Sequence, residues 1–222
     1  MTTKEKLQWL LAQENADGEA NAQFAMLSRL SYDASAAVRG LTAAQLAAFD
    51  GPAANRILLR LAKDKKAQVR MEAYDSLAAY DTGETFRFLQ NAIGTERDAL
   101  ARSYAILSCG DVFSQLPETR AQRDAFHTFL NVQLNAERQP HCILAYCYAL
   151  IQLGDQGVFS RLLSFLSAKD YHIRCTALAH LEDLPWPDNQ EAICRAVAHV
   201  AAYDPSVAVR DRARRLLAQL ET

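Results

Sequence analysis

The sequence predicts an all-α chain, an α-solenoid of about six stacked two-helix units with a capping helix at its N-terminal end. The first observation is a recurring pattern in which an acidic residue is followed, six residues later, by an arginine that opens an apolar helix. The clearest copies are Asp33…Arg39, Asp64…Arg70, Glu96…Arg102 and Asp204…Arg210. The second observation is that small and apolar residues then recur at steps of three and four. Because short helical units bury their apolar faces only against each other, this period predicts a stacked array.

The arginine position divides the chain into units. Its six occurrences are Arg39, Arg70, Arg102, Ile143, Arg174 and Arg210, with spacings of 31, 32, 41, 31 and 36 residues. Each interval accommodates two short helices and two turns. We expect paired helices at 19–31 with 35–49, 52–62 with 65–80, 83–93 with 96–109, 118–134 with 139–153, 155–166 with 169–184, and 188–203 with 205–220. A further helix near 3–14 would cap the stack, so residues 1–222 form a single domain with a cap (1–18) and repeats (19–220).

The apolar stripes of the second helices predict the core. They comprise Val69, Ala73, Leu77 and Tyr80 in the second unit, Ile173, Ala177, Leu181 and Leu184 in the fifth, and Val209, Ala213, Leu217 and Leu220 in the last. Steps of three and four place each set on one helix face. The small residue in the middle allows neighbouring helices to approach closely.

Prolines, glycines and capping residues predict the helix ends. Pro52, Pro140 and Pro205 can each occupy a first helical turn, where the missing N–H costs nothing. Residues 81–84 and 188–191 are typical of capping boxes that begin with Asp and end with Glu. Gly94, Gly110 and Gly154 are expected where helices stop.

Two segments interrupt the regular pattern. Residues 111–118 fall in the 41-residue interval, and an insertion there either lengthens a helix or projects as a loop, with a longer turn favoured over a binding loop. Residues 184–187, Leu-Pro-Trp-Pro, predict a rigid kink in which Trp186 covers an apolar gap.

Composition narrows the functional classes. Half of the 222 residues are apolar, but neither an 18-residue apolar run nor a signal peptide is evident, so we expect a cytoplasmic protein that does not enter membranes. Five cysteines, an odd number, favour reduced core thiols over a disulfide framework. A net charge of −2 and a pI near 6.2 argue against a general nucleic-acid binder and favour a basic partner.

The pattern resembles a known family, the short HEAT-like repeats of bacterial proteins of the phycobilisome-lyase type. The resemblance rests on the Asp…Val-Arg…Ala…Leu pattern and on Ala-rich second helices such as residues 38–46, and it covers about residues 19–220. The fourth unit departs from it, with Ile143 where arginine is expected. The resemblance implies that each acid caps a second helix while each arginine reaches the neighbouring turn, a structural ladder made by Asp33, Arg39, Asp64, Arg70, Glu96, Arg102, Arg174, Asp204 and Arg210.

No strong catalytic or metal-binding fingerprint is present. A phosphate loop, HExxH, GxSxG and a paired-cysteine zinc pattern are all missing, so we expect no catalytic residue, no cofactor and no metal. His172, Cys175 and His180 share one predicted helix, but spacings of three and five keep them off a common face, which favours packed or solvated side chains over zinc. The basic run at residues 210–215 is confined to the last helix and is typical of a solvated helix end rather than a nucleic-acid groove.

Outward positions of the second helices are the candidate partner-binding residues. Counting along each second helix selects Glu72, Asp75, Tyr148, His180, Asp183 and Arg212. This mixed, mostly acidic groove suits a folded protein with a basic surface, although for any single position plain surface is favoured over a role in binding. We therefore hypothesise a non-enzymatic protein-binding module, a monomer before complex formation.

The resemblance extends this hypothesis to an immunity protein that neutralises a cognate nuclease-type bacterial toxin. Other functions stay open: a general adaptor or scaffold, a HEAT-like bilin lyase, or a HEAT-like DNA glycosylase. A bound chromophore or base-excision activity would favour the enzymes, whereas one tight protein partner would favour the inhibitor.

Overall fold

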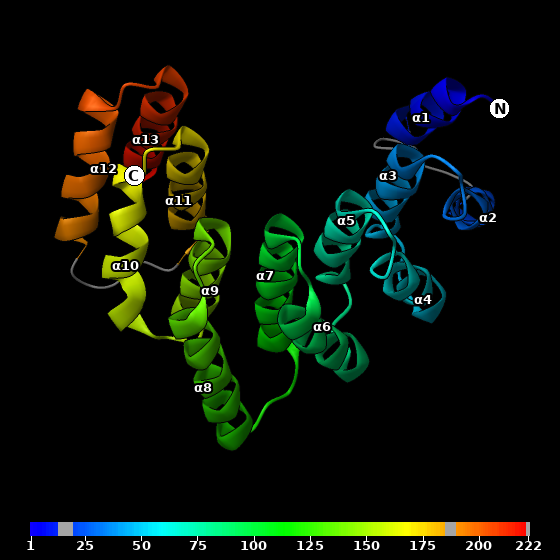
Figure 1. The fold of residues 1–222 in the computed structure, drawn as a ribbon, viewed down its shortest axis with the longest axis horizontal. Helices are drawn as coiled ribbons and strands as arrows, with labels where there is room; N and C mark the ends of the chain where they lie inside the picture. The colour runs from blue at the N-terminus through cyan, green and yellow to red at the C-terminus, as the bar shows by residue number, and fades with distance from the viewer. Residues whose placement is uncertain (13–19, 185–189, 221–222) are drawn as a thin grey trace. The chain divides into compact units, whose positions relative to one another are not determined.

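The computed structural model describes residues 1–12, 20–184 and 190–220, and the secondary structure in this part of the chain is helical throughout (Figure 1). The prediction of an all-α array of helical repeats is confirmed. The chain divides into two compact units, unit 1 (Met1–Pro117) and unit 2 (Glu118–Thr222), which are described separately.

Unit 1 contains three helix pairs and a preceding helix. Its elements are α1 (Thr3–Ala12), α2 (Ala20–Leu30), α3 (Ala36–Leu46), α4 (Pro52–Leu61), α5 (Ala67–Leu77), α6 (Gly83–Thr95) and α7 (Ala99–Gln115). The second helices of the pairs stack directly, α3 on α5 and α5 on α7, and α1 packs on α3 in the same way. The first helices α2, α4 and α6 each pack on the second helix of their own pair (Figure 1). The expected capping helix is therefore α1, which extends the row of second helices.

Unit 2 contains the other three pairs. Its elements are α8 (Arg120–Ala136), α9 (Pro140–Gln152), η2 (Gln156–Val158), α10 (Phe159–Ser164), η3 (Phe165–Ser167), α11 (Tyr171–Asp183), α12 (Glu191–Tyr203) and α13 (Val207–Leu220). The second helices again pack in sequence, α9 on α11 and α11 on α13. The first helix of the fifth pair is broken into two 3₁₀ turns around the six-residue α10, whereas one continuous helix was expected at 155–166.

The predicted apolar stripes form the core of both units. All eight stripe residues of the second and fifth units are at most 7% exposed. In the last unit Val209 and Ala213 are fully buried, while Leu217 is half-buried. The cysteines agree with this placement, since Cys109, Cys142 and Cys147 are buried and all five thiols are free.

Several helix ends match the expected signals. Pro52 and Pro140 each occupy the first turn of their helix. Gly51 precedes Pro52 with a φ of +99°, and Gly154 follows α9 with a φ of +94°, a backbone conformation that glycine adopts without strain. Pro205, by contrast, lies two residues before α13, so its assignment to a first turn is wrong.

Other end signals are corrected by local hydrogen bonding. The N-cap of α6 is Thr82, not Asp81, because the Thr82 hydroxyl accepts the Thr85 N–H at 3.1 Å. A complete capping box occurs instead at Thr119 and Gln122, where α8 begins.

Helix α7 does not stop at Gly110. It continues to Gln115 because Val112 and Phe113 are buried, and the Phe113 ring lies 5.2 Å from that of Phe86 on α6. The 111–118 insertion therefore lengthens a helix. Gly94 also lies within a helix, one residue before the end of α6.

Three expectations involve residues outside the described part of the chain: the end of the capping helix at 13–14, the kink with Trp186, and the capping box at 188–191. The grouping of residues 1–222 in a single domain stays a prediction.

Candidate protein-binding site

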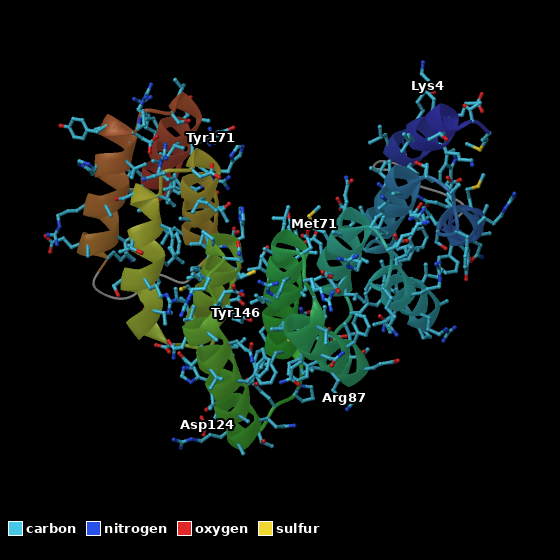
Figure 2. The ribbon with its side chains drawn as sticks, in the orientation of Figure 1. Lys4, Met71, Arg87, Asp124, Tyr146 and Tyr171 are labelled. Carbon is cyan, nitrogen blue, oxygen red and sulfur yellow. The ribbon has the colours of Figure 1, made fainter. Side chains whose placement is uncertain are left out.

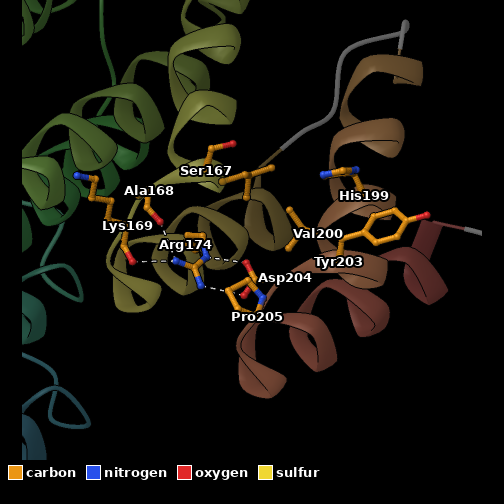
Figure 3. Close-up of a pocket in the computed structure, with 10 residues that line it drawn as sticks. Ser167, Ala168, Lys169, Arg174, His199, Val200, Tyr203, Asp204 and Pro205 are labelled. Atoms are coloured by element: carbon orange, nitrogen blue, oxygen red, sulfur yellow. Dashed lines mark hydrogen bonds and ion pairs between the residues drawn. The ribbon is translucent and has the colours of Figure 1, made fainter.

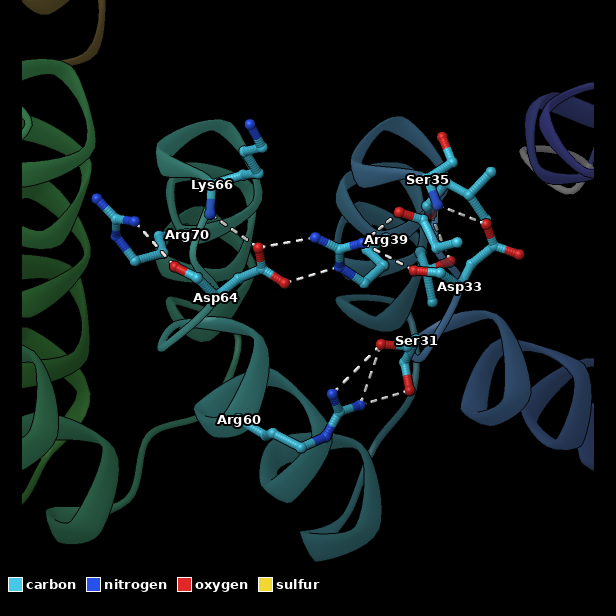
Figure 4. A network of polar contacts seen from close by, with 11 residues as sticks. Ser31, Asp33, Ser35, Arg39, Arg60, Asp64, Lys66 and Arg70 are labelled. Atoms are coloured by element: carbon cyan, nitrogen blue, oxygen red, sulfur yellow. Dashed lines mark hydrogen bonds and ion pairs between the residues drawn. The ribbon is translucent and has the colours of Figure 1, made fainter. Parts of the chain in front are cut away.

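The repeated arginines and acids make regular contacts between neighbouring helix pairs in unit 1. Arg39 binds the Asp64 carboxylate from the next turn through Nε and Nη2, at 2.7 and 2.9 Å, while its Nη1 donates to the Asp33 backbone oxygen at 2.7 Å (Figure 4). Arg70 repeats this arrangement with the Glu96 carboxylate at 2.6 and 2.7 Å. Hydrogen bonding to Arg39 lowers the pKa of Asp64, so this carboxylate is ionised at neutral pH.

The acids do not cap the helices as expected. Asp33 and Asp64 accept the N–H of the residue two positions later, Ser35 and Lys66, at 2.8 and 2.9 Å. Ser35 and Lys66 are themselves the N-caps, and neither has a side-chain capping bond. Each acid therefore stabilises the turn before its helix and presents its carboxylate to the preceding repeat.

Related contacts occur at the other ladder positions. At the start, Lys6 of α1 binds Asp33 at 2.5 Å in place of an arginine. In unit 2, Arg174 binds the Asp204 carboxylate at 2.6 and 2.8 Å. Arg102 and Arg210 each donate from Nη1 to the backbone oxygen six residues earlier, at 2.9 and 2.5 Å.

One arginine–acid contact of the ladder is missing, and both of its residues are replaced. Ile143 replaces the arginine of the fourth pair, and the position six residues before Arg174, where its acidic partner would lie, is Ala168. An apolar residue and a small residue thus replace an arginine and an acid together, which leaves no buried charge unpaired at this step.

Glu72 and Asp75 differ from the ladder acids because they have no cation. Both lie on α5, Glu72 half-buried and Asp75 exposed, and neither carboxylate makes a hydrogen bond or ion pair within the described residues. Burial raises the pKa of Glu72, and the neighbouring Asp75 charge raises it further. Burial also raises the pKa of Asp75, because surrounding protein atoms displace water on one side of the carboxylate.

Residues of the adjacent helices surround this pair. Tyr104 of α7 is close enough that Asp75 and Glu72 add to the effect of burial and raise its pKa. On the other side, a Cβ added at Gly40 would lie 3.6 Å from Glu72 Cγ, so the Glu72 side chain extends over α3. In Figure 2 the label Met71 marks the residue before Glu72 on α5.

We call Glu72, Asp75, Tyr104 and Leu107 the acidic face. Sequence reasoning missed its second half, although the signal was present: Tyr104 lies two residues after its arginine, as Glu72 does, and Leu107 lies five after, as Asp75 does. Leu100, at the start of α7, is 44% exposed and adds apolar surface to the same helix.

The remaining predicted partner-binding residues lie in unit 2. Tyr148 of α9 and His180 of α11 are in ring contact at 4.8 Å. His180 was expected to point outward, but it is only 9% exposed. It lies six residues after its arginine, a position that is also buried at Ser76 and Ser108, so this register position faces inward. Burial lowers the pKa of His180 to about 4, with smaller effects from nearby basic side chains.

Arg212 and Asp183 differ in their availability. Arg212 of α13 binds Glu182 of α11 at 2.6 and 3.1 Å and thereby joins two helices of its own unit. Asp183 is exposed at the end of α11. Unit 2 therefore brings Tyr148, His180 and Arg212 together on successive second helices, but all three are engaged in internal contacts.

The histidines and cysteines give no metal centre in the described part of the chain. His172 contacts Asp170 at 3.0 Å, whereas His180 packs on Tyr148. Burial raises the pKa of the Cys147 thiol to about 12, which keeps it protonated and unreactive at neutral pH.

A surface cavity of about 350 Å³ lies between η3 and α12 (Figure 3). The Arg174–Asp204 pair forms one wall, and His199 and Tyr203 also line it. Arg174 donates in addition to the backbone oxygens of Ala168 and Lys169, so its donors are directed at the protein rather than into the cavity.

Comparison with known proteins supports the repeat assignment for unit 1. A family model of HEAT repeats matches residues 25–110. These residues run from α2 into α7 and include the Arg39–Asp64 and Arg70–Glu96 contacts. The match to HEAT repeats thus covers the acidic face, and HEAT repeats commonly mediate binding between proteins. No curated protein matches the chain.

No helix among the described residues has the length and apolar character needed to cross a membrane.

Proposed function

We propose that this chain is a non-enzymatic, cytoplasmic protein-binding module whose acidic face receives a basic and partly apolar surface of a partner protein. The observation that carries this proposal is the Glu72–Asp75 pair, two partly desolvated carboxylates without a cation. Such an arrangement destabilises the folded protein, because burial and like charge both disfavour ionisation. A lysine or arginine from a partner would relieve both effects.

The surrounding side chains favour a protein over a simple cation. Tyr104 offers an aromatic ring next to the carboxylates, and Leu100 and Leu107 add apolar contact on the same helix. Tyrosine and arginine are among the residues most often found at the energetic centre of protein interfaces. A basic side chain flanked by apolar groups would therefore fit this surface.

The finer proposal is an immunity protein that neutralises a nuclease-type toxin. A nuclease needs a basic surface to bind phosphates, and an acidic binding module that covers this surface blocks substrate access without chemistry of its own. A general adaptor would use the same face for several weaker partners.

The test starts from the tagged full-length protein, isolated from its native cytosol with its stoichiometric partner. The affinity for the purified partner is then measured calorimetrically for Glu72→Gln/Asp75→Asn and for Glu72→Lys/Asp75→Lys. Two exposed acids at the start of α6 give matched controls with equal charge changes, Asp81→Asn/Glu84→Gln and Asp81→Lys/Glu84→Lys. Circular dichroism verifies that each variant is folded.

We expect the neutral variant to weaken binding by at least about tenfold and the lysine variant to abolish it, whereas the controls stay within about twofold. Equal losses of affinity in the test and control variants would mean that net charge alone causes the effect. This result would refute binding of the partner at the acidic face. If the partner is a nuclease, stoichiometric inhibition of its activity supports the immunity function, and undiminished activity in the complex excludes it.

A further inference from the structure

The C-terminal end of unit 2 presents a guanidinium in the conformation of the ladder arginines, but without a carboxylate. Arg210 donates from Nη1 to the Asp204 backbone oxygen at 2.5 Å, as Arg39 does to Asp33 at 2.7 Å. In Arg39 the remaining donors, Nε and Nη2, bind the Asp64 carboxylate. No carboxylate occupies the corresponding place at Arg210 among the described residues. Arg210 is half-buried.

An exposed aromatic ring accompanies this arginine. Tyr203 directly precedes the acid of its turn, as Tyr32 does in the first pair. The Tyr32 ring receives the guanidinium of Arg60, from the first helix of the next pair, with Cζ 3.8 Å from the ring centroid. Tyr203 is 74% exposed, and its ring contacts that of His199 at 5.0 Å between centroids. Within the described part of unit 2, no lysine or arginine makes a cation–π contact with Tyr203, which Figure 3 shows beside His199.

We propose that this end of unit 2 is a docking site for a segment of another protein that consists of a helix followed by an acidic turn. The turn supplies a carboxylate to Arg210, and the helix before it supplies a cation to Tyr203. A fork-shaped guanidinium binds a carboxylate through two parallel hydrogen bonds, and a cation over a tyrosine ring adds a second, separate attraction. The Asp204 oxygen already orients the guanidinium, which reduces the entropy lost on binding.

A second copy of this chain is a poor occupant. Four of its own ladder acids already bind a cation: Asp33 binds Lys6, Asp64 binds Arg39, Glu96 binds Arg70 and Asp204 binds Arg174. Docking of one copy on another through these turns would first break an internal ion pair. A different protein with an unoccupied acidic turn is therefore favoured. The site lies apart from the acidic face in sequence and in unit, so it is independent of the proposed function.

The experiment uses the full-length protein with ¹⁵N-labelled arginine side chains. The probe is the blocked heptapeptide of residues 202–208, Ala-Tyr-Asp-Pro-Ser-Val-Ala, which reproduces the turn that Arg174 binds. The control peptide carries Asn in place of Asp. We expect the Arg210 Nε–H resonance to shift saturably with the acidic peptide, and the Asn peptide to bind at least about tenfold more weakly.

Two variants separate binding from folding. Arg210→Gln should lose the peptide while its melting temperature stays close to that of the parent protein, and Arg210→Lys, which keeps the charge but not the fork, should bind weakly. Equal affinity for both peptides, or unchanged binding by Arg210→Gln, would overturn the proposal. A change of the Nε resonance in the peptide-free protein on Glu221→Gln, a position outside the described residues, would mean that the chain fills the site itself and would also refute it. A dimer that dissociates on Arg210→Gln, seen by sedimentation, would assign the site to a second copy and refute a different partner.

Discussion

Arg174 and Asp204 are joined by two parallel hydrogen bonds, and their side chains are only 8% and 4% exposed. Arg174 also donates to the backbone oxygens of Ala168 and Lys169, so one guanidinium connects three segments of unit 2. Arg174 occupies the same position in its repeat as Arg39 and Arg70, which make contacts of the same form in unit 1. The stability of each unit should therefore depend strongly on these arginines.

Removal of a ladder arginine that binds a buried carboxylate should be far more damaging than removal of a surface arginine. We expect Arg174→Gln to lower the free energy of unfolding by roughly 3–5 kcal/mol, since it leaves Asp204 buried without its cation. The control is Arg195→Gln, which breaks the exposed pair with Glu191 on α12 and should cost less than ~1 kcal/mol. Urea denaturation measures the free energy of unfolding of both variants. Similar losses would show that the ladder contacts stabilise the protein no more than an exposed ion pair does.

The missing step should accept a restored ion pair. Ile143→Arg alone and Ala168→Asp alone should each destabilise the protein, because each adds an unpaired, partly buried charge. The double variant should recover at least about 1 kcal/mol relative to the sum of the single changes. A double-mutant cycle in urea measures this coupling. Strict additivity would mean that positions 143 and 168 do not meet as the other steps do.

His180 should make unit 2 sensitive to mild acid. Its pKa is lowered to about 4 in the folded protein, against 6.5 for an exposed histidine. As the pH falls below 6.5, His180 is therefore protonated in the unfolded chain, whereas in the folded protein it stays neutral until the pH nears 4. The free energy of unfolding should decrease by roughly 2 kcal/mol between pH 7 and pH 5 from this group.

The matched variants for this effect are His180→Leu and the exposed His199→Gln. Thermal melts over this pH range should show a smaller acid sensitivity for His180→Leu than for the parent protein, while His199→Gln behaves like the parent. The same pH slope in all three proteins would contradict the assignment.

The ionised carboxylates of the acidic face should lower the stability of the folded protein when no partner is bound. Because the pKa values of Glu72 and Asp75 are raised on folding, their ionisation destabilises the folded protein as the pH rises through those values. At pH 7, Glu72→Gln/Asp75→Asn should stabilise the protein slightly, by less than about 1 kcal/mol given the solvent contact of both side chains. Calorimetric unfolding of the variant, with Asp81→Asn/Glu84→Gln as control, measures the sign, and destabilisation would argue against an unpaired carboxylate pair.

Partner binding should show the converse pH dependence. A cationic partner favours the ionised carboxylates, so affinity should increase as the pH rises through their raised pKa values, with release of protons on binding. Calorimetry in two buffers of different ionisation enthalpy measures this release. Binding that is independent of pH in this range would place the partner elsewhere.

The candidate site could be predicted only in part. Offsets from the arginine selected Glu72 and Asp75, because an exposed helix position is a local property of the repeat. The same offsets from Arg102 lead to Tyr104 and Leu107, which the sequence analysis did not select. His180 was assigned wrongly: whether its register position faces solvent depends on how closely α9 and α11 approach, and the Tyr148 ring fills that space.

Steps of three and four and local backbone preferences predict the helical repeat, the register of the buried stripes and the residues that lie at each turn. The packing of the helix pairs, by contrast, sets which side chains bind each other. An arginine binds an acid 25 or more residues later, and its geometry exists only once two helix pairs have stacked. It also decided which acids have no partner, since the desolvation of Glu72 and Asp75 arises from neighbouring helices.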